Sequence, residues 1–207
     1  MAVDDSEVGS EVEGYLTPGR TGRAALYVAI PVGLVVLLLV GVLFTRHSAE
    51  DKAAFTPLQD KPVPEVKGTT LDGRSFDIDA YRGRWVVVNF FATWCVPCQQ
   101  EHPELASFAR RHTQAGDAEV VSLVFQDDPA KVRAYLAENG GEWPVIIGSD
   151  ADFALAFSIT GVPESFLVDP SGIVRARLIG GVTSVGLDDT INALTLKLYP
   201  DVAATSS

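Results

Sequence analysis

The stretch "FFATWCVPCQQEH", from Phe90 to His102, contains the only two cysteines of the 207-residue chain, Cys95 and Cys98. A structural disulfide between them would close a very small loop, which restricts the unfolded chain little and stabilises weakly. A zinc site needs about four ligands, and the chain offers only three histidines besides this pair, with no second CxxC motif. The stretch therefore favours a redox pair over a structural bridge or a metal site.

The residues around the pair predict a reactive position for it. "WVVVNFF", from Trp85 to Phe91, is a continuous apolar run typical of a strand covered on both faces. From Cys95 to about Thr113 apolar residues recur at spacings of three and four, which predicts a helix that Pro103 should kink near its second turn. The pair would then lie at a helix N-terminus, where unpaired N–H groups and the helix dipole favour a thiolate.

Strands and helices alternate along the rest of this region. The expected elements are a hairpin turning at 72–73, strands at 118–126 and 143–148, helices at 128–141 and 149–159, a hairpin turning at 169–172 and a final helix at 187–199. This order predicts an α/β fold with a mixed central sheet flanked by helices.

The N-terminal part of the chain has a different composition. Residues 24–44 are uncharged, and as a helix they would span about 30 Å of hydrocarbon, so we expect one uncleaved transmembrane anchor rather than a signal peptide or a core helix. We expect 1–23 to be a disordered acidic cytoplasmic tail, 45–62 a tether, 63–199 the folded domain and 200–207 a disordered C-terminal tail. The basic residues flanking the anchor give only a slight positive-inside bias. The simplest topology keeps the tail in the cytoplasm and places the domain outside the cell membrane.

The net charge of −11 bears on partners. An acidic surface disfavours contact with phosphate backbones, so we expect no nucleic-acid partner.

"VVVNFFATWCVPCQQEHPEL", followed about sixty residues later by "GVPESFLVD", resembles the thioredoxin superfamily. Within it, the chain is similar to the membrane-anchored thioredoxin-like proteins of cytochrome c maturation, of the CcmG/DsbE and ResA/TlpA type. The resemblance covers about Pro62 to Tyr199 and implies a thioredoxin-like fold. WCxxC with a downstream proline is specific for the superfamily, whereas the subfamily rests on softer features: the anchor, "EH" after the second cysteine, the insertion before the proline and "PESFLVD".

The resemblance also implies roles for the central residues. Cys95 attacks and Cys98 resolves, with no cofactor beyond the redox-active Cys95–Cys98 disulfide and no metal. General thiol chemistry agrees, because a thiolate at the exposed helix start forms a mixed disulfide that a thiol one turn away can release. On this view Cys95 is the more exposed cysteine. The resemblance further implies a cis bond between Val162 and Pro163, whose backbone groups would pair with an extended substrate.

Three polar residues have two interpretations each. Glu101, one helical turn after Cys98, either acts on the thiols through charge and proton transfer or is a solvated surface residue. Glu164 either matches the family's acidic residue at the rim of the site or is an ordinary exposed strand residue. Asn89 stands where ordinary thioredoxins carry a buried aspartate, which leaves Glu101 as the nearest proton carrier, or it only makes a structural hydrogen bond.

Other residues near the pair are less specific. Trp94 is expected to shield the thiols and contact substrate, or only to pack. Pro97 either tunes the redox potential or only stiffens the first helical turn, where a proline removes no helix hydrogen bond. Trp85 and Trp143 are expected in the core, and His102 on the helix surface without a ligand role.

The leading hypothesis for function is an extracytoplasmic thiol-disulfide reductase. It would reduce the CxxCH cysteines of apocytochrome c, or another disulfide-bearing exported protein, and be re-reduced by a membrane electron donor of the CcdA/DsbD type. A DsbE-like oxidase that inserts disulfides is the alternative, because about 30 mV of reduction potential changes the equilibrium tenfold. A copper-binding module is disfavoured, since the only methionine is Met1 and no histidine pattern accompanies the cysteines.

Overall fold

The computed structural model describes residues 27, 30–38, 54, 56–148 and 150–200. Residues 30–38 are helical with exposed side chains and belong to a unit separate from the folded domain. No helix in the described part of the chain is both long and apolar enough to cross a bilayer. The acidic tail and most of the predicted anchor, tether and C-terminal tail lie outside the described residues.

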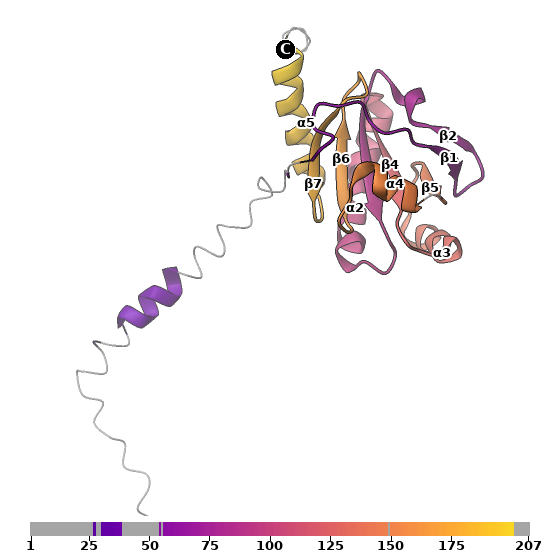
Figure 1. Cartoon of the computed structure of the whole chain (residues 1–207). Coiled ribbons are helices and arrows are strands. Elements are labelled where there is room, and N and C mark those ends of the chain that lie inside the picture. Colours follow the sequence, from indigo (N-terminus) through magenta and orange to yellow (C-terminus); the bar gives the residue numbers. More distant parts are fainter. Residues whose placement is uncertain (1–26, 28–29, 39–53, 55, 149, 201–207) are drawn as a thin grey trace, which may run out of the picture. The chain divides into compact units, whose positions relative to one another are not determined.

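The elements of the domain follow the predicted order (Figure 1). They are β1 (Lys67–Thr70), β2 (Ser75–Asp77), the 3-10 helix η2 (Ile78–Tyr81), β3 (Trp85–Phe91), α2 (Val96–Ala115), β4 (Ala118–Val124), α3 (Pro129–Asn139), β5 (Val145–Ile147), α4 (Asp150–Phe157), β6 (Glu164–Val168), β7 (Val174–Ile179) and α5 (Ser184–Leu198). α2 continues through Pro103 and ends at Gly116, whose positive φ suits a glycine C-cap. The predicted α/β fold is confirmed.

The strands form one mixed sheet in the order β2-β1-β5-β4-β3-β6-β7. β3 runs parallel to β4 and antiparallel to β6, and all seven of its residues are buried. In this register Asn89 lies between Ser122 of β4 and Ser165 of β6. A polar residue of the central strand therefore has polar neighbours on both sides.

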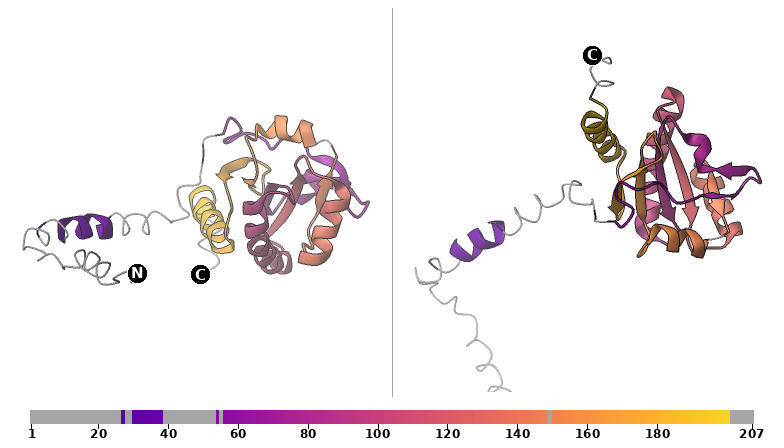
Figure 2. Two further views of the ribbon diagram at one scale, coloured as in Figure 1. Left: turned by 90° about the horizontal axis from the view of Figure 1, so that it is seen from below. Right: turned by 45° about the horizontal axis from the view of Figure 1, so that its top comes forward.

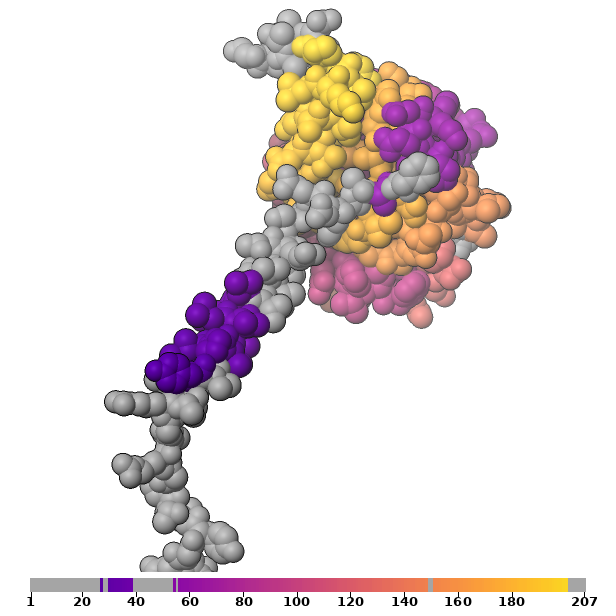
Figure 3. All heavy atoms as spheres, turned by 60° about the vertical axis from the view of Figure 1, so that its left-hand side comes forward, coloured from indigo at the N-terminus to yellow at the C-terminus, as the bar shows by residue number. Residues whose placement is uncertain are grey.

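Helices cover both faces of the sheet, which Figure 2 shows in its left view. Leu105 of α2 and Leu187 of α5 belong to the apolar cluster on one face. On the other face Phe157 of α4 packs edge-on against Phe90 and Phe166. Each such buried aromatic contributes about 1.5–3 kcal/mol relative to exposure. In Figure 3 the yellow α5 forms one flank of the domain beside the orange hairpin strands.

The folded domain begins earlier than the predicted Val63. Thr56 is buried, the Asp60 amide donates to the carbonyl oxygen of Val174 at 2.9 Å, and Pro62 forms a bridge with Ile173. The prediction that the tether extends to residue 62 is therefore wrong for 56–62. This segment pairs with the edge strand β7, a long-range contact that its proline-rich sequence does not reveal.

Candidate active site

The two cysteines form a disulfide at the N-terminus of α2. β3 ends at Phe91, a short loop follows, and Cys95 is the N-cap residue of the helix, with Pro97 in the first turn. The Cys98 amide donates to Cys95 Sγ at 3.2 Å. The predicted position is confirmed, and a Cys95 thiolate would face both this N–H group and the positive end of the helix dipole.

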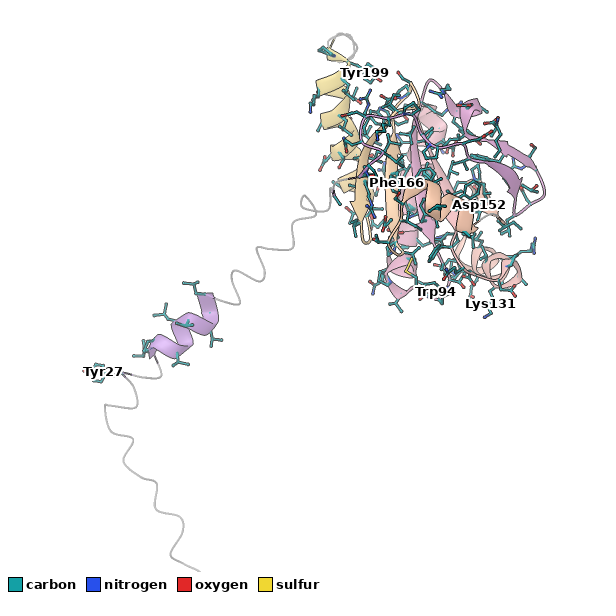
Figure 4. All side chains as sticks on the ribbon, in the orientation of Figure 1. Tyr27, Trp94, Lys131, Asp152, Phe166 and Tyr199 are labelled. Carbon is teal, nitrogen blue, oxygen red and sulfur yellow. A yellow bond between two sulfur atoms is a disulfide. The ribbon has the colours of Figure 1, made fainter. Side chains whose placement is uncertain are left out.

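Exposure does not distinguish the two cysteines. Cys95 is 4% and Cys98 3% exposed, so both are buried and the predicted difference in exposure is only one percentage point. Both side chains belong to the apolar cluster under α2, where the disulfide keeps the sulfurs together. The neighbours are the exposed groups: Val96 lies largely in solvent, and Trp94, 57% exposed, lies beside the sulfur–sulfur bond in Figure 4. The two cysteines therefore differ in position within the helix rather than in exposure.

The peptide bond between Val162 and Pro163 is cis, as the resemblance implied. The Pro163 carbonyl accepts a hydrogen bond from the Gly180 amide at 2.9 Å. The next residue, Gly181, lies against α2, since a Cβ built on it would be in van der Waals contact with the Pro97 carbonyl oxygen at 3.7 Å. The β7–α5 loop thus joins the cis-proline turn to the first turn of α2.

Glu101 is a buried residue behind the disulfide, so its interpretation as a solvated surface glutamate is wrong. Its Oε1 accepts from Asn89 Nδ2 and its Oε2 from the Val182 amide, both at 2.9 Å. With Cys98 and Asn89 it lines the same small hollow. One carboxylate therefore joins α2, β3 and the β7–α5 loop beside Cys98.

Asn89 is fully buried and makes the structural hydrogen bonds expected of a core residue. Its Nδ2 donates to Glu101 Oε1 and, at 3.1 Å, to Ser165 Oγ. Its Oδ1 has no hydrogen-bond partner among the described residues. The amide nitrogen of Asn89 is thus hydrogen-bonded, whereas its oxygen has no partner among the described residues.

Glu164, directly after the cis proline, is buried, so its interpretation as an ordinary exposed strand residue is wrong. Its Oε2 forms an ion pair with Arg177 Nη2 at 2.8 Å. Its Oε1 accepts at 2.8 Å from both the amide and the hydroxyl of Thr160, and at 3.2 Å from the Gly161 amide. Pairing of β6 with β7 brings the arginine to this carboxylate, which holds the turn that precedes Pro163.

A second loop, between β4 and α3, supports the residues before Cys95. The Trp94 indole N–H donates to the Gln126 carbonyl at 3.0 Å. Asp127 Oδ2 accepts from the Thr93 amide at 2.5 Å and from its hydroxyl at 2.7 Å. Thr93, Gln126 and Asp127 were not predicted from the sequence. The available signal was topological, since parallel neighbours β3 and β4 end at the same edge of the sheet.

The remaining aromatic and histidine predictions have mixed outcomes. Trp85 and Trp143 are buried in the core as predicted. His102 is also buried rather than on the helix surface, because the 139–141 loop covers it, and its Nε2–H donates to the Gly140 carbonyl at 3.0 Å. Burial lowers the pKa of His102 below its usual 6.5. Burial therefore disfavours the charged form of this histidine.

Known proteins similar to this chain include thiol:disulfide interchange proteins, in agreement with the disulfide at the start of α2. The profile of the Redoxin family matches residues 58–191. The chain belongs to the Redoxin family. It is 31% identical over 156 residues to the thiol:disulfide interchange protein DsbE of Allochromatium vinosum, covering 74% of this chain and 83% of that protein. It is 29% identical over 167 residues to the thiol:disulfide interchange protein HelX of Rhodobacter capsulatus, covering 79% and 88%.

A solved structure supports the same assignment. The crystal structure of a thioredoxin-family thiol:disulfide interchange protein from Chlorobium tepidum superposes with a TM-score of 0.60 and 29% identity, covering 68% of this chain and 98% of that one. This redoxin therefore has a thioredoxin-like fold and is a thiol-disulfide oxidoreductase of the DsbE/CcmG, ResA/HelX type.

Proposed function

We propose that this redoxin is a membrane-anchored, extracytoplasmic reductase of the CxxCH cysteines of apocytochrome c. The observation that carries the proposal is the Cys95–Cys98 disulfide at the N-terminus of α2, with the buried Glu101 behind it. The client is inferred from the resemblance of the WCxxC and "GVPESFLVD" segments to cytochrome c maturation proteins.

The reaction uses the two cysteines in turn. The Cys95 thiolate attacks one sulfur of the client disulfide, and the other client sulfur leaves and takes up a proton. Cys98 then loses its proton and attacks Cys95 Sγ, which releases the second client thiol and forms the disulfide seen here. A membrane dithiol donor of the CcdA/DsbD type returns two electrons and two protons, and its own thiols become a disulfide.

The client would lie across the surface next to the pair. We expect an extended peptide to pair with the backbone at the Val162–Pro163 turn, as in strand addition. Pro163 has no N–H group and its carbonyl already accepts from the Gly180 amide, so Val162 would supply the pairing groups. The exposed side chains of Trp94 and Val96 offer apolar contact beside the disulfide. A CxxCH segment bound in this way would present one cysteine to Cys95.

The proposed location depends on residues 24–44, which would anchor the chain with its N-terminus in the cytoplasm. In whole cells with a reduced Cys95, a thiol reagent that cannot cross membranes should label this residue, and the full-length protein should sediment with membranes. Recovery in the soluble fraction, or labelling only after lysis, would contradict this location.

The client proposal is tested by trapping. Cys98→Ala removes the resolving thiol, so the mixed disulfide through Cys95 should persist, whereas Cys95→Ala should capture little. Mass spectrometry of the captured partner should identify a CxxCH peptide joined through one cysteine. A range of cysteine-rich secreted proteins without a CxxCH client would support the oxidase alternative, and equal capture by both variants would contradict the assigned roles.

A further inference from the structure

The unpaired oxygen of Asn89 is an unusual feature of the site. The side chain is fully buried, and Oδ1 has no hydrogen-bond partner in the part of the chain that the structure describes. Most buried polar side-chain atoms in proteins have a partner, because an unpaired one loses its contact with water without replacement. This oxygen therefore calls for a donor that is absent in the disulfide state.

The other contacts of the amide indicate where Oδ1 points. Nδ2 is directed toward Ser165 of β6, and the two ends of an amide point apart, so Oδ1 is directed away from β6. On the β4 side Asn89 lines a small hollow together with Cys98, Glu101 and Ser122. The hollow is too narrow for a water molecule. Its donor must therefore come from the protein.

Reduction creates one new donor beside this hollow. Glu101 already receives N–H groups at both carboxylate oxygens, and Ser122 Oγ, which accepts from the indole of Trp143 at 2.8 Å, makes no hydrogen bond to Asn89 Oδ1. Cys98 carries no sulfur-bound hydrogen in the disulfide, but its reduced form gains an S–H group. We propose that Asn89 Oδ1 accepts a hydrogen bond from the Cys98 thiol in the reduced protein.

This bond would act on the redox equilibrium. A dithiol donor reduces the pair by giving two electrons and two protons, so the Cys95–Cys98 bond breaks, both sulfurs become thiols and the donor forms its own disulfide. A hydrogen bond that exists only after this step stabilises the dithiol state. It also keeps the proton on Cys98 until the mixed disulfide forms on Cys95. The inference rests on the thiol-disulfide chemistry of the site and not on the identity of the client, so either proposal can fail alone.

A spectroscopic test isolates the thiol. The chain has three asparagines, so side-chain ¹³Cγ signals can be assigned, with Asn139 and Asn192 as internal references. Cys95→Ala retains the Cys98 thiol, and Cys98→Ala lacks it, while neither variant has the disulfide. The Asn89 signal should move downfield in reduced wild type and in Cys95→Ala, and it should match the oxidised protein in Cys98→Ala. The same shift in both variants, or none in either, would overturn the proposal.

A functional test uses a matched pair of substitutions. Asn89→Ala removes Oδ1, whereas Ser165→Ala removes only an Nδ2 partner and leaves Oδ1 in place. In equilibrium with a reference dithiol, Asn89→Ala should shift the pair toward the disulfide by about two- to tenfold, and Ser165→Ala should not. An unchanged equilibrium in Asn89→Ala, or an equal shift in both, would overturn the proposal. If Asn89→Ala does not fold, the ¹³C comparison alone decides.

Discussion

Glu101 Oε1 accepts a 2.9 Å hydrogen bond from Asn89 Nδ2. This bond joins α2, which carries the disulfide, to the central strand β3. The second oxygen of Glu101 holds the Val182 amide, so the carboxylate is fixed on both sides. We expect this buried acid to act on the reduced thiols through charge, because a nearby carboxylate disfavours a thiolate.

Glu101→Gln should therefore make the reduced thiols ionise more easily. Removing the negative charge should lower the pKa of the nearby thiol, which the pH dependence of alkylation measures. A glutamine cannot accept from both N–H donors, so unfolding in urea should show a loss of about 1–3 kcal/mol.

Glu104→Gln is the matched control for this substitution. Glu104 lies one helical turn further along α2, and its Oε2 accepts from the Ser184 amide at 2.9 Å. The Glu104→Gln variant should be less stable than wild type, but its thiols should titrate as in wild type. An unchanged thiol titration in Glu101→Gln would reduce Glu101 to a structural role.

The ion pair of Glu164 and Arg177 predicts a large stability effect. Both side chains are buried, so Arg177→Met leaves an uncompensated buried carboxylate and should cost about 3–5 kcal/mol in urea unfolding. The double variant with Glu164→Gln should cost less than the sum of the single variants. Lys67→Met, which breaks an exposed pair with Glu65, should cost less than about 1 kcal/mol. Additive effects at Glu164 and Arg177 would contradict the coupling.

Local pattern was sufficient to predict most of the fold. The apolar run of β3, the turn at Asp72-Gly73 and the proline after Asp128 each depend on near neighbours, and the structure has them where expected. Burial of acids was not predictable in the same way. Glu101 and Glu164 are surface residues by type, and only their partners on distant elements make burial possible.

The same limit applies to the packing of the N-terminal segment and to Asn89. Residues 56–62 have the composition of a linker, and their pairing with β7 depends on tertiary contact. The asparagine was recognised because it departs from a family pattern, whereas its unpaired oxygen follows from the register of three strands. Patterns along the chain locate a site, and contacts between elements determine its electrostatics.

Glu119 on β4 gives a pH-dependent prediction away from the site. Burial raises the pKa of its carboxyl above the ordinary 4.5, although Arg84 opposes the shift. Well below pH 4.5 the Glu119 carboxyl is protonated in both the folded and the unfolded state, so its ionisation has no effect on stability. As the pH rises above 4.5, the Glu119 carboxyl ionises first in the unfolded state, because its pKa is lower there. Stability therefore falls until the carboxyl of the folded state also ionises. Glu119→Gln should therefore raise the urea midpoint at pH 7 and leave it unchanged near pH 3. A variant less stable than wild type at pH 7 would show that the contact with Arg84 dominates.

The bond between Thr93 and Asp127 predicts a positioning effect on client exchange. Thr93→Val removes the hydroxyl that donates to Asp127 Oδ2 but keeps the backbone donor, so the loop before Cys95 should loosen. Trp94 lies on that loop and would present a less fixed surface to a peptide. The rate of exchange with a peptide disulfide should fall by about two- to tenfold, the range expected for one hydrogen bond. Exchange with a small aromatic disulfide should change less, because it needs only the thiolate.

Two variants control for general damage to this loop. Thr93→Ser keeps the hydroxyl and should behave like wild type. Asp128→Asn alters the neighbouring residue, whose side chain caps α3 by accepting from the Ala130 amide, and asparagine caps a helix as well as aspartate. In both control variants, the rates of exchange with the peptide disulfide and with the small aromatic disulfide should therefore stay near those of wild type. Equal slowing of the peptide and the small disulfide in Thr93→Val would mean that the loop sets the reactivity of Cys95 itself, and equal rates in Thr93→Val and Thr93→Ser would show that the hydroxyl has no role.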